Sequence, residues 1–476
     1  MPGVPKDMIG GLSPNLMGFI FESAISNPIK TAFSSKSAVE VTREMYNDRY
    51  WNESTHDYCK FYNQKFGKFN TDCLVCIPRK WYDRRELDQA KAKKRPVFVY
   101  IHGGGWCYFN THCFNQFLQY LSHKLQAIVI APEYRLAPEN PYPSGLDDCY
   151  DVVTDLLKNY SGEEPEKRLN EPFSEINLDI DNRMLIGGDS AGGNLSAATL
   201  VRLVEKFYPD HEDAPRLLGA CLVYPVLQNV TNMVPSLRYN LTTSSSTIKS
   251  MMDLSAKYCD GDDGRRAVSA MADDCENTIQ ESHRMHYLYE RMNPEKYLSR
   301  VESNYFSGDM DKEADPAENA LFDEDFIKAK NKKRSKYSDH MALHQQMANP
   351  EISPCAASDE IMQKIVDFGP KFIYTMGCQY CGLRDEGLIY MERLRELSDN
   401  DTERYFYSTA ARTIHGWLSG STSYGNGEPE PTGNSKLDQN RRQWNSLCND
   451  WIERIQQRIL KKAEVEEEES ESSDSD

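Results

Sequence analysis

The order of apolar and polar positions along the chain predicts strands that alternate with helices. Short apolar runs bounded by glycines or turns are typical of buried parallel strands, and the sequence has six of them: Val97–Ile101, Ala127–Ala131, Arg183–Ile186, Leu218–Tyr224, Phe372–Met376 and Arg404–Tyr407. Helical stretches lie between most of these runs, for example Cys113–Leu125, Asp147–Lys158 and Leu195–Phe207. This alternation predicts an α/β protein with a mostly parallel, twisted sheet and helices on both faces.

Two regions interrupt the alternation. Residues 229–371 contain no convincing strand and are densely charged, acidic and then basic between Ser307 and His340. We interpret that stretch as part of a solvated, partly disordered insertion rather than a binding patch. The last residues carry eight carboxylates among serines, cannot bury a core, and are predicted to be disordered. The predicted organisation is an N-terminal cap segment (1–65), an α/β domain (66–462) with a cap or insertion at about 229–370, and an acidic tail (463–476).

Composition narrows the classes of partner. The net charge of −18 argues against binding to nucleic acid or to an anionic membrane. No apolar run approaches the roughly 18 residues that a spanning helix needs, and the N-terminus lacks the pattern of a secretory signal. The 13 cysteines are scattered, unlike a disulfide scaffold. We therefore expect a cytoplasmic protein without a membrane-spanning segment.

The first chemical motif surrounds Ser190. The predicted strand Arg183–Ile186 leads into Gly188-Asp189-Ser190-Ala191-Gly192, and a helical run follows. This is the G-x-S-x-G pattern of a nucleophile elbow. Such a turn forces the serine backbone into a strained conformation, and side chains at the flanking glycines would clash. We predict Ser190 as the nucleophile, at the N-terminal end of a helix whose N–H groups face developing negative charge.

A run of glycines follows an earlier strand. Val97–Ile101 leads into His102-Gly103-Gly104-Gly105-Trp106, which exposes backbone N–H groups that can converge on an oxyanion. The predicted donors are Gly103 and Gly104, together with the N–H of Ala191. His415 lies just beyond the last predicted strand, after the serine in chain order, and is the predicted general base.

These residues together resemble the hormone-sensitive-lipase branch of α/β-hydrolases, and most closely its arylacetamide deacetylase-like members. The two motifs above match that family's signatures, and residues 132–143 and 379–387 match a structural stretch and the loop that carries the triad acid. The resemblance covers roughly residues 70–230 and 365–420. It implies an α/β-hydrolase fold with a helical cap, and esterase or amidase chemistry on acyl groups attached to small apolar molecules. Deacetylase-like relatives usually begin with a membrane anchor, which we do not find here.

The acid of the triad is where the sequence departs from the family. The family pattern places the aspartate where this chain has Cys381, and Asp385 matches a second, mainly structural acid of the loop. Asp385 could take over the role through a shifted loop, or Cys381 could ionise beside the imidazole. A third alternative is a weak or inactive enzyme, because neutralising the triad acid of a serine protease costs about 10⁴ in turnover. We take Asp385 as the candidate acid.

The pair Cys378 and Cys381 also forms a C-x-x-C motif. A redox or zinc role needs a helix N-terminus or a second cysteine pair, and neither is evident in the sequence. We therefore interpret the motif as two unrelated cysteines at a strand end. The sequence implies no cofactor and no metal.

Two classes of function remain. The first is a serine carboxylesterase or lipase-like hydrolase that works through an acyl-enzyme and that loss of the triad acid would weaken. The alternative is an inactive hydrolase-fold protein that binds ligands or acts as an interaction module. The intact nucleophile, base and oxyanion loop favour the enzyme.

Overall fold

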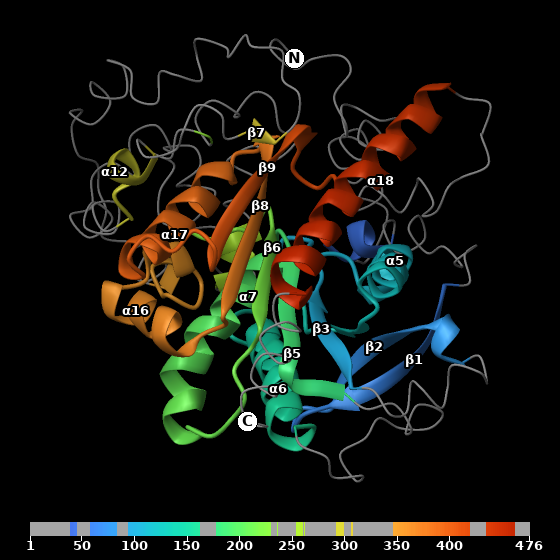
Figure 1. The fold of residues 1–476 in the computed structure, drawn as a ribbon, viewed down its shortest axis with the longest axis horizontal. Helices are drawn as coiled ribbons and strands as arrows, with labels where there is room; N and C mark the ends of the chain where they lie inside the picture. Colours follow the sequence, from blue (N-terminus) through green and yellow to red (C-terminus); the bar gives the residue numbers. More distant parts are fainter. Residues whose placement is uncertain are drawn as a thin grey trace, which may run out of the picture.

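A nine-stranded sheet forms the centre of the computed structural model, and helices cover both of its faces (Figure 1). The structure describes residues 39–44, 58–82, 94–161, 178–229, 236, 254–259, 261, 292–298, 306–307, 346–418 and 435–461. The charged stretch 308–340, the acidic tail and residues 1–38 lie outside the described residues.

The strands follow the order β1-β2-β4-β3-β5-β6-β8-β9-β7 across the sheet. Their bounds are Cys59–Phe66 (β1), Thr71–Pro78 (β2), Arg95–Ile101 (β3), Ile128–Pro132 (β4), Leu178–Asp189 (β5), Gly219–Val223 (β6), Phe306–Ser307 (β7), Phe372–Tyr380 (β8) and Tyr405–Ile414 (β9). Only β1 with β2 and β2 with β4 pair antiparallel, and every other described pair is parallel. All six predicted strands are confirmed as β3, β4, β5, β6, β8 and β9.

The long helices divide between the two faces of the sheet (Figure 1). One face carries α5 (Asn115–Leu125) and α18 (Ser435–Ile455), and the other carries α6 (Ser144–Asn159), α7 (Ala191–Arg202), α16 (Asp359–Phe368) and α17 (Arg384–Leu397). Shorter helical pieces are α12 (Pro294–Leu298), 3₁₀ turns at Arg79–Tyr82, Thr111–Phe114, Tyr208–Asp210 and Pro354–Ala356, and π turns at Leu203–Phe207 and Gln456–Leu460. The predicted α/β architecture is therefore confirmed.

The middle of the sheet is buried on both faces, because helices cover it on each side. Every residue of β4 and β6 is buried, as are all of β3 after Arg95. This explains why these strands appear in the sequence as continuous apolar runs without alternation. β1, by contrast, mixes buried and exposed residues and joins the sheet although all but its last residue lies within the predicted N-terminal cap segment.

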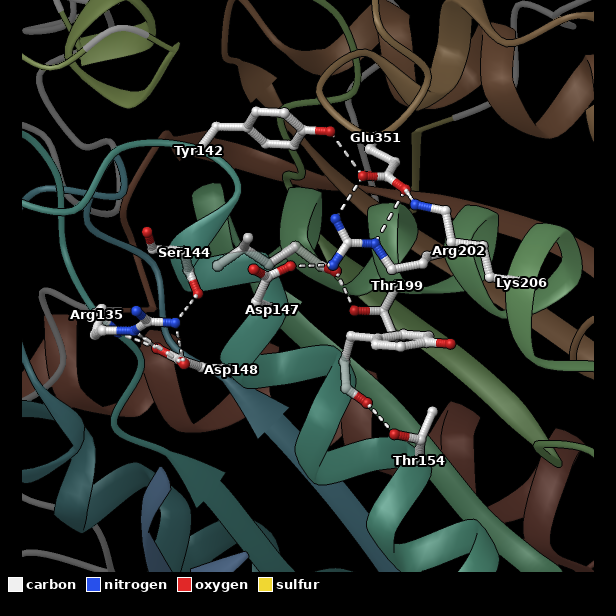
Figure 2. A network of polar contacts seen from close by, with 12 residues as sticks. Arg135, Tyr142, Ser144, Asp147, Asp148, Thr154, Thr199, Arg202, Lys206 and Glu351 are labelled. Atoms are coloured by element: carbon white, nitrogen blue, oxygen red, sulfur yellow. Dashed lines mark hydrogen bonds and ion pairs between the residues drawn. The ribbon is translucent and has the colours of Figure 1, made fainter. Parts of the chain in front are cut away.

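Residues 346–357 lead from the insertion back into the α/β domain, and Glu351 binds this segment to α7 (Figure 2). Arg202 of α7 donates to the two carboxylate oxygens of Glu351 at 3.0 and 2.5 Å, and the Tyr142 hydroxyl donates at 2.7 Å. A third nitrogen of the same guanidinium pairs with Asp147 of α6 at 2.5 Å. Burial raises the pKa of the Glu351 carboxyl, but the bonds from Arg202 and Tyr142 outweigh burial and lower it to about 2.

Replacing Glu351 by alanine is expected to lower the free energy of unfolding by about 3 kcal/mol, because it leaves the Arg202 guanidinium buried without its main partner. The matched control is Asp72→Ala, which removes an ion pair with Lys65 whose side chains are both 58% exposed. That change should cost less than about 1 kcal/mol. Urea unfolding measures both, and equal losses would contradict a special role for Glu351.

The same contact predicts how stability depends on pH. The pKa of Glu351 is lower in the folded chain than the ordinary 4.5, so its contribution is complete above that value. It should be lost as the pH falls toward 2 in the parent, and be missing at every pH in Glu351→Ala.

Candidate active site

Ser190 lies in a sharp turn between β5 and α7. Its backbone has φ 54° and ψ −118°, a strained conformation for a residue with a side chain. A Cβ added at Gly188 or Gly192 would lie 2.1 or 2.0 Å from the carbonyl oxygen of Ile101. The turn is thus packed so closely against the end of β3 that only glycine fits on either side of the serine.

His415 lies beside the serine, in the turn after β9. Its Nε2 atom is 2.9 Å from the Ser190 Oγ. The ring of Tyr224 packs edge-on against the imidazole, with 4.8 Å between the ring centroids. The structure therefore brings the predicted nucleophile and the predicted base into hydrogen-bond contact, although 225 residues separate them in the sequence.

The partner at the other ring nitrogen is a sulfur. Cys381, just after β8, places its Sγ 3.3 Å from the His415 Nδ1. The backbone N–H of Leu383 donates to the same sulfur at 3.4 Å, and the neighbouring Cys378 lowers the pKa of the Cys381 thiol. Because α17 begins at Arg384, the sulfur lies next to the N-terminus of a helix, where negative charge is favoured.

These contacts shift the pKa values of Cys381 and His415 in opposite directions. Burial raises the pKa of a thiol, but the hydrogen bond from Cys378 and the nearby His415 outweigh burial, so the pKa of Cys381 lies well below the ordinary 9.0. Burial lowers the pKa of His415, but the Cys381 sulfur raises it by more, to above the ordinary 6.5. The pair therefore favours a thiolate beside an imidazole that holds its proton more tightly.

Asp385, the acid predicted from the sequence, lies elsewhere. It is buried at the start of α17, where the backbone N–H of Ser236 donates to its carboxylate at 2.7 Å and the Arg384 guanidinium at 2.8 Å. The hydrogen-bond partner of His415 Nδ1 is Cys381 instead. The loop has not shifted to bring Asp385 forward, because its carboxylate is already held by these two donors.

Asp385→Asn should therefore act on stability and not on chemistry. An amide retains part of the contact with Ser236 but loses the charge that pairs with Arg384, at an expected cost of about 2 kcal/mol. We expect kcat for ester hydrolysis to stay within about fivefold of the parent, far from the 10⁴ typical of a triad acid. Denaturant unfolding and initial rates on one preparation separate the two effects. A large loss of kcat with unchanged stability would assign Asp385 to the triad.

The glycine loop after β3 faces the elbow, but its first N–H is already occupied. Gly103 donates its N–H to the Asp189 carboxylate at 2.9 Å, and Tyr100 donates to the same oxygen at 2.9 Å. Burial raises the pKa of Asp189, although these two bonds counteract it. Asp189 thus ties the loop to the elbow, a role that the sequence reading missed.

Other N–H groups remain for an oxyanion. Within the described chain, the backbone N–H groups of Gly104, Gly105 and Ala191 make no hydrogen bond. Gly105 was not among the predicted donors. Its position in the motif was a signal that could have identified it, since each glycine of the run exposes a backbone amide.

Side chains from the insertion cover this loop. A Cβ at Gly105 would lie 2.6 Å from the Leu254 Cδ1, and the Tyr258 ring stacks on Trp106 with 4.6 Å between centroids. From the N-terminal side, Arg43 donates to the carbonyl of Cys107 at 2.7 Å. The insertion and the N-terminal cap segment therefore both contact the oxyanion loop or the residue that follows it.

Comparison with known proteins agrees with this geometry. Residues 98–284 match the profile of a family described as having the alpha/beta hydrolase fold. The arylacetamide deacetylase of Mus musculus is 27% identical over 324 residues, which cover 67% of this chain and 68% of that protein. The enzyme of Bos taurus is 27% identical over 331 residues, covering 68% of this chain and 70% of that protein.

The solved structures extend the likeness of the fold. A bacterial heroin esterase superposes with a TM-score of 0.51 at 17% identity, covering 89% of this chain and 91% of that chain. The chain has the α/β-hydrolase fold and is similar to the arylacetamide deacetylases. Among its described residues, no helix is both long and apolar enough to cross a membrane. The described residues also contain no group of three His, Cys, Asp or Glu side chains that could hold a metal.

Proposed function

We propose that this hydrolase cleaves carboxylic esters or amides of small apolar molecules through an acyl-enzyme. Ser190 is the nucleophile, His415 the general base, and the Cys381 thiolate the group that orients the imidazole. The observation that carries the proposal is the continuous contact from Ser190 Oγ through both nitrogens of His415 to Cys381 Sγ, at 2.9 and 3.3 Å.

The protonation state of Cys381 decides whether this arrangement can work. A neutral thiol that donates to Nδ1 would leave the proton of the imidazole on Nε2, which then could not accept the serine proton. A thiolate accepts a hydrogen bond from the Nδ1–H group, which keeps the proton on Nδ1 and leaves Nε2 free to accept the serine proton. The Leu383 N–H donates to the sulfur, and Cys378 and His415 lower the pKa of the Cys381 thiol, which supports the thiolate form.

The reaction follows from these positions. His415 takes the proton of Ser190 as its Oγ attacks the acyl carbonyl, and the N–H groups of Gly104, Gly105 and Ala191 hold the oxyanion. Collapse of the tetrahedral intermediate expels the alcohol or amine, which receives the proton from His415. Water then attacks the acyl-serine by the same route in reverse.

The substrate class is an acyl group on an apolar leaving group. Leu254, Trp106 and Tyr258 place apolar groups at the oxyanion loop, which supports a hydrophobic ligand. The names of the similar proteins, an arylacetamide deacetylase and a heroin esterase, describe acyl groups on aromatic molecules and support the same class.

The competing hypothesis of an inactive binding protein rested on the absence of an acid at position 381. The contacts of Cys381 weigh against that reason, because its sulfur lies at the Nδ1 of His415, where a triad acid would be, and accepts a backbone N–H.

The test is hydrolysis of p-nitrophenyl acetate, p-nitrophenyl butyrate and an aryl acetamide by the full-length protein, with labelling by a fluorophosphonate probe. We expect turnover of the esters and covalent labelling that peptide mapping places on Ser190. Folded protein that neither turns over any of them nor reacts with the probe would overturn the proposal in favour of ligand binding.

A further inference from the structure

The C-x-x-C motif lies inside the candidate active site. Cys378 is buried in β8, Cys381 is buried just beyond it, and each of the two side chains shifts the pKa of the other. The interpretation as unrelated cysteines is therefore wrong. α17 begins three residues after Cys381, so a helix N-terminus, which was not evident in the sequence, also lies at the pair.

We propose that Cys378 and Cys381 are a site of oxidation by hydrogen peroxide, and that the disulfide between them switches the hydrolase off. The inference rests on the proposed function, because it assigns the switch to the sulfur that orients His415. Three contacts carry it: Cys381 with His415, Cys381 with the Leu383 N–H, and Cys381 with Cys378.

The chemistry takes two steps. The Cys381 thiolate attacks one peroxide oxygen, the O–O bond breaks, and the products are a sulfenic acid on Cys381 and hydroxide. The Cys378 sulfur then gives up its proton and attacks the Cys381 sulfur, which expels hydroxide and forms the S–S bond. Two electrons pass from the two sulfurs to one peroxide molecule, which is reduced to two molecules of water once the released protons are counted.

The environment separates the roles of the two sulfurs. Cys381 accepts hydrogen bonds and is the nucleophilic thiolate, whereas burial and the neighbouring Cys381 raise the pKa of Cys378, which remains the thiol that resolves the sulfenic acid. Buried cysteines elsewhere in the fold differ. Burial raises the pKa of Cys59 and of Cys355 to about 12, so these sulfurs stay protonated and inert.

Burial of the pair determines which oxidant can reach it. Cys378 and Cys381 have 0% and 1% of their surface exposed, while Ser190 on the far side of His415 is 9% exposed. A bulky disulfide cannot enter such a space, whereas hydrogen peroxide is only slightly larger than water. We therefore assign the site to peroxide and expect glutathione disulfide to act far more slowly.

Oxidation removes the anionic hydrogen-bond acceptor of His415 Nδ1. A disulfide sulfur carries no charge and is a weak acceptor, so Nδ1 loses its anionic partner and the imidazole loses its orientation. Loss of the triad acid in a serine protease lowers turnover by about 10⁴, and we expect a loss of at least about 10²-fold here. Reduction by dithiothreitol should restore the thiolate and the activity.

The experiment exposes the full-length protein to increasing hydrogen peroxide, removes the excess with catalase, and measures p-nitrophenyl acetate hydrolysis before and after dithiothreitol. Trypsin cleaves after Lys371 and Arg384, giving a peptide with Cys378 and Cys381 as its only cysteines. We expect activity to fall in step with the loss of two hydrogen atoms from this peptide, and both changes to reverse with dithiothreitol.

Two variants make the result specific. Cys381→Asp keeps a negative partner for His415 without a thiol, so its turnover should not respond to the same peroxide doses. Cys378→Ala keeps the reactive sulfur without its resolving partner, so peroxide should carry Cys381 to sulfinic acid, which dithiothreitol does not reverse. Equal inactivation of Cys381→Asp and the parent, or inactivation without the disulfide in the peptide, would overturn the proposal.

Peptide mapping also distinguishes failure of the proposed function from failure of the peroxide switch. A parent protein without turnover would refute the proposed function and with it the switch. The peptide would still show whether peroxide joins Cys378 to Cys381, since that measurement needs no activity.

Discussion

Replacing Cys381 by serine is expected to lower kcat for ester hydrolysis by about 10³-fold, close to the 10⁴ that removal of the triad acid costs a serine protease. A serine hydroxyl stays neutral at every working pH and cannot supply the negative charge that stabilises the His415 imidazolium. It can also donate to Nδ1, which holds the imidazole in the wrong tautomer for the Ser190 proton. Steady-state kinetics on p-nitrophenyl acetate measure the effect, which should fall on kcat and leave KM little changed.

The matched variant is Cys381→Asp, which restores the carboxylate found at this position in the family. Because the thiolate already provides a negative acceptor, we expect its kcat to lie within about tenfold of the parent. The pair of variants separates charge from size, since serine is closer to cysteine in shape but lacks the charge. Full activity in Cys381→Ser would show that the sulfur has no role in orienting His415.

Replacing Ser190 by alanine has the largest expected effect, a loss of about 10⁶ in kcat, as removal of a triad serine causes in subtilisin. The hydroxyl is the atom that forms the acyl-enzyme, so no neighbouring group can replace it. Fluorophosphonate labelling should disappear together with turnover. The residual rate reports what the oxyanion N–H groups and binding contribute without covalent chemistry.

The control for this variant is Ser196→Ala, on the helix that follows the elbow. The Ser196 hydroxyl is buried like that of Ser190 but bonds only to the Gly192 carbonyl one turn earlier, at 2.8 Å. We expect nearly full activity and unchanged labelling. Comparable losses in both variants would point to damage to α7 instead of loss of a nucleophile.

The parts of the fold that the sequence predicted are those where local pattern and tertiary environment agree. The central strands are buried on both faces, so each appears as an uninterrupted apolar run. The elbow was recognisable because its geometry requires glycine at Gly188 and Gly192, where a Cβ would meet the Ile101 carbonyl. Backbone constraints of this kind leave a clear trace in a single sequence.

The β1–β2 hairpin was not predicted from the sequence, although β2 carries the buried apolar run Cys73–Ile77. β1 lies at the edge of the sheet, and its residues Lys60, Asn63, Gln64 and Lys65 give it a polar sequence that lacks the apolar run of a buried strand. Its pairing with β2 depends on tertiary contact and not on local preference. The docking of Glu351 onto Arg202 could not be predicted either, because 149 residues separate the two partners.

In the candidate active site too, some residues could be predicted from the sequence and others could not. Chain order and position after the last strand were enough to predict His415 next to Ser190, which the structure places in contact. The partner of His415 Nδ1 was not predictable from residue type, because a triad acid is normally a carboxylate. Asp385 carries a carboxylate in this loop, whereas position 381 holds a cysteine. Only the tertiary arrangement shows that Asp385 is held by Ser236 and Arg384, and that Cys381 lies at Nδ1. Gly103 was likewise a reasonable donor until its N–H proved to be bound by Asp189.

The most direct test of the central claim, a thiolate that orients His415, is the pH dependence of kcat/KM in the parent and in Cys381→Ser. Only the neutral imidazole can accept the Ser190 proton, so activity falls as the pH drops through the pKa of His415. The negative sulfur raises that pKa above the ordinary 6.5, and burial without the sulfur lowers it. We expect an ascending limb with its midpoint above 6.5 in the parent, and a midpoint shifted to lower pH in the residual activity of Cys381→Ser. The same midpoint in both proteins would contradict this claim.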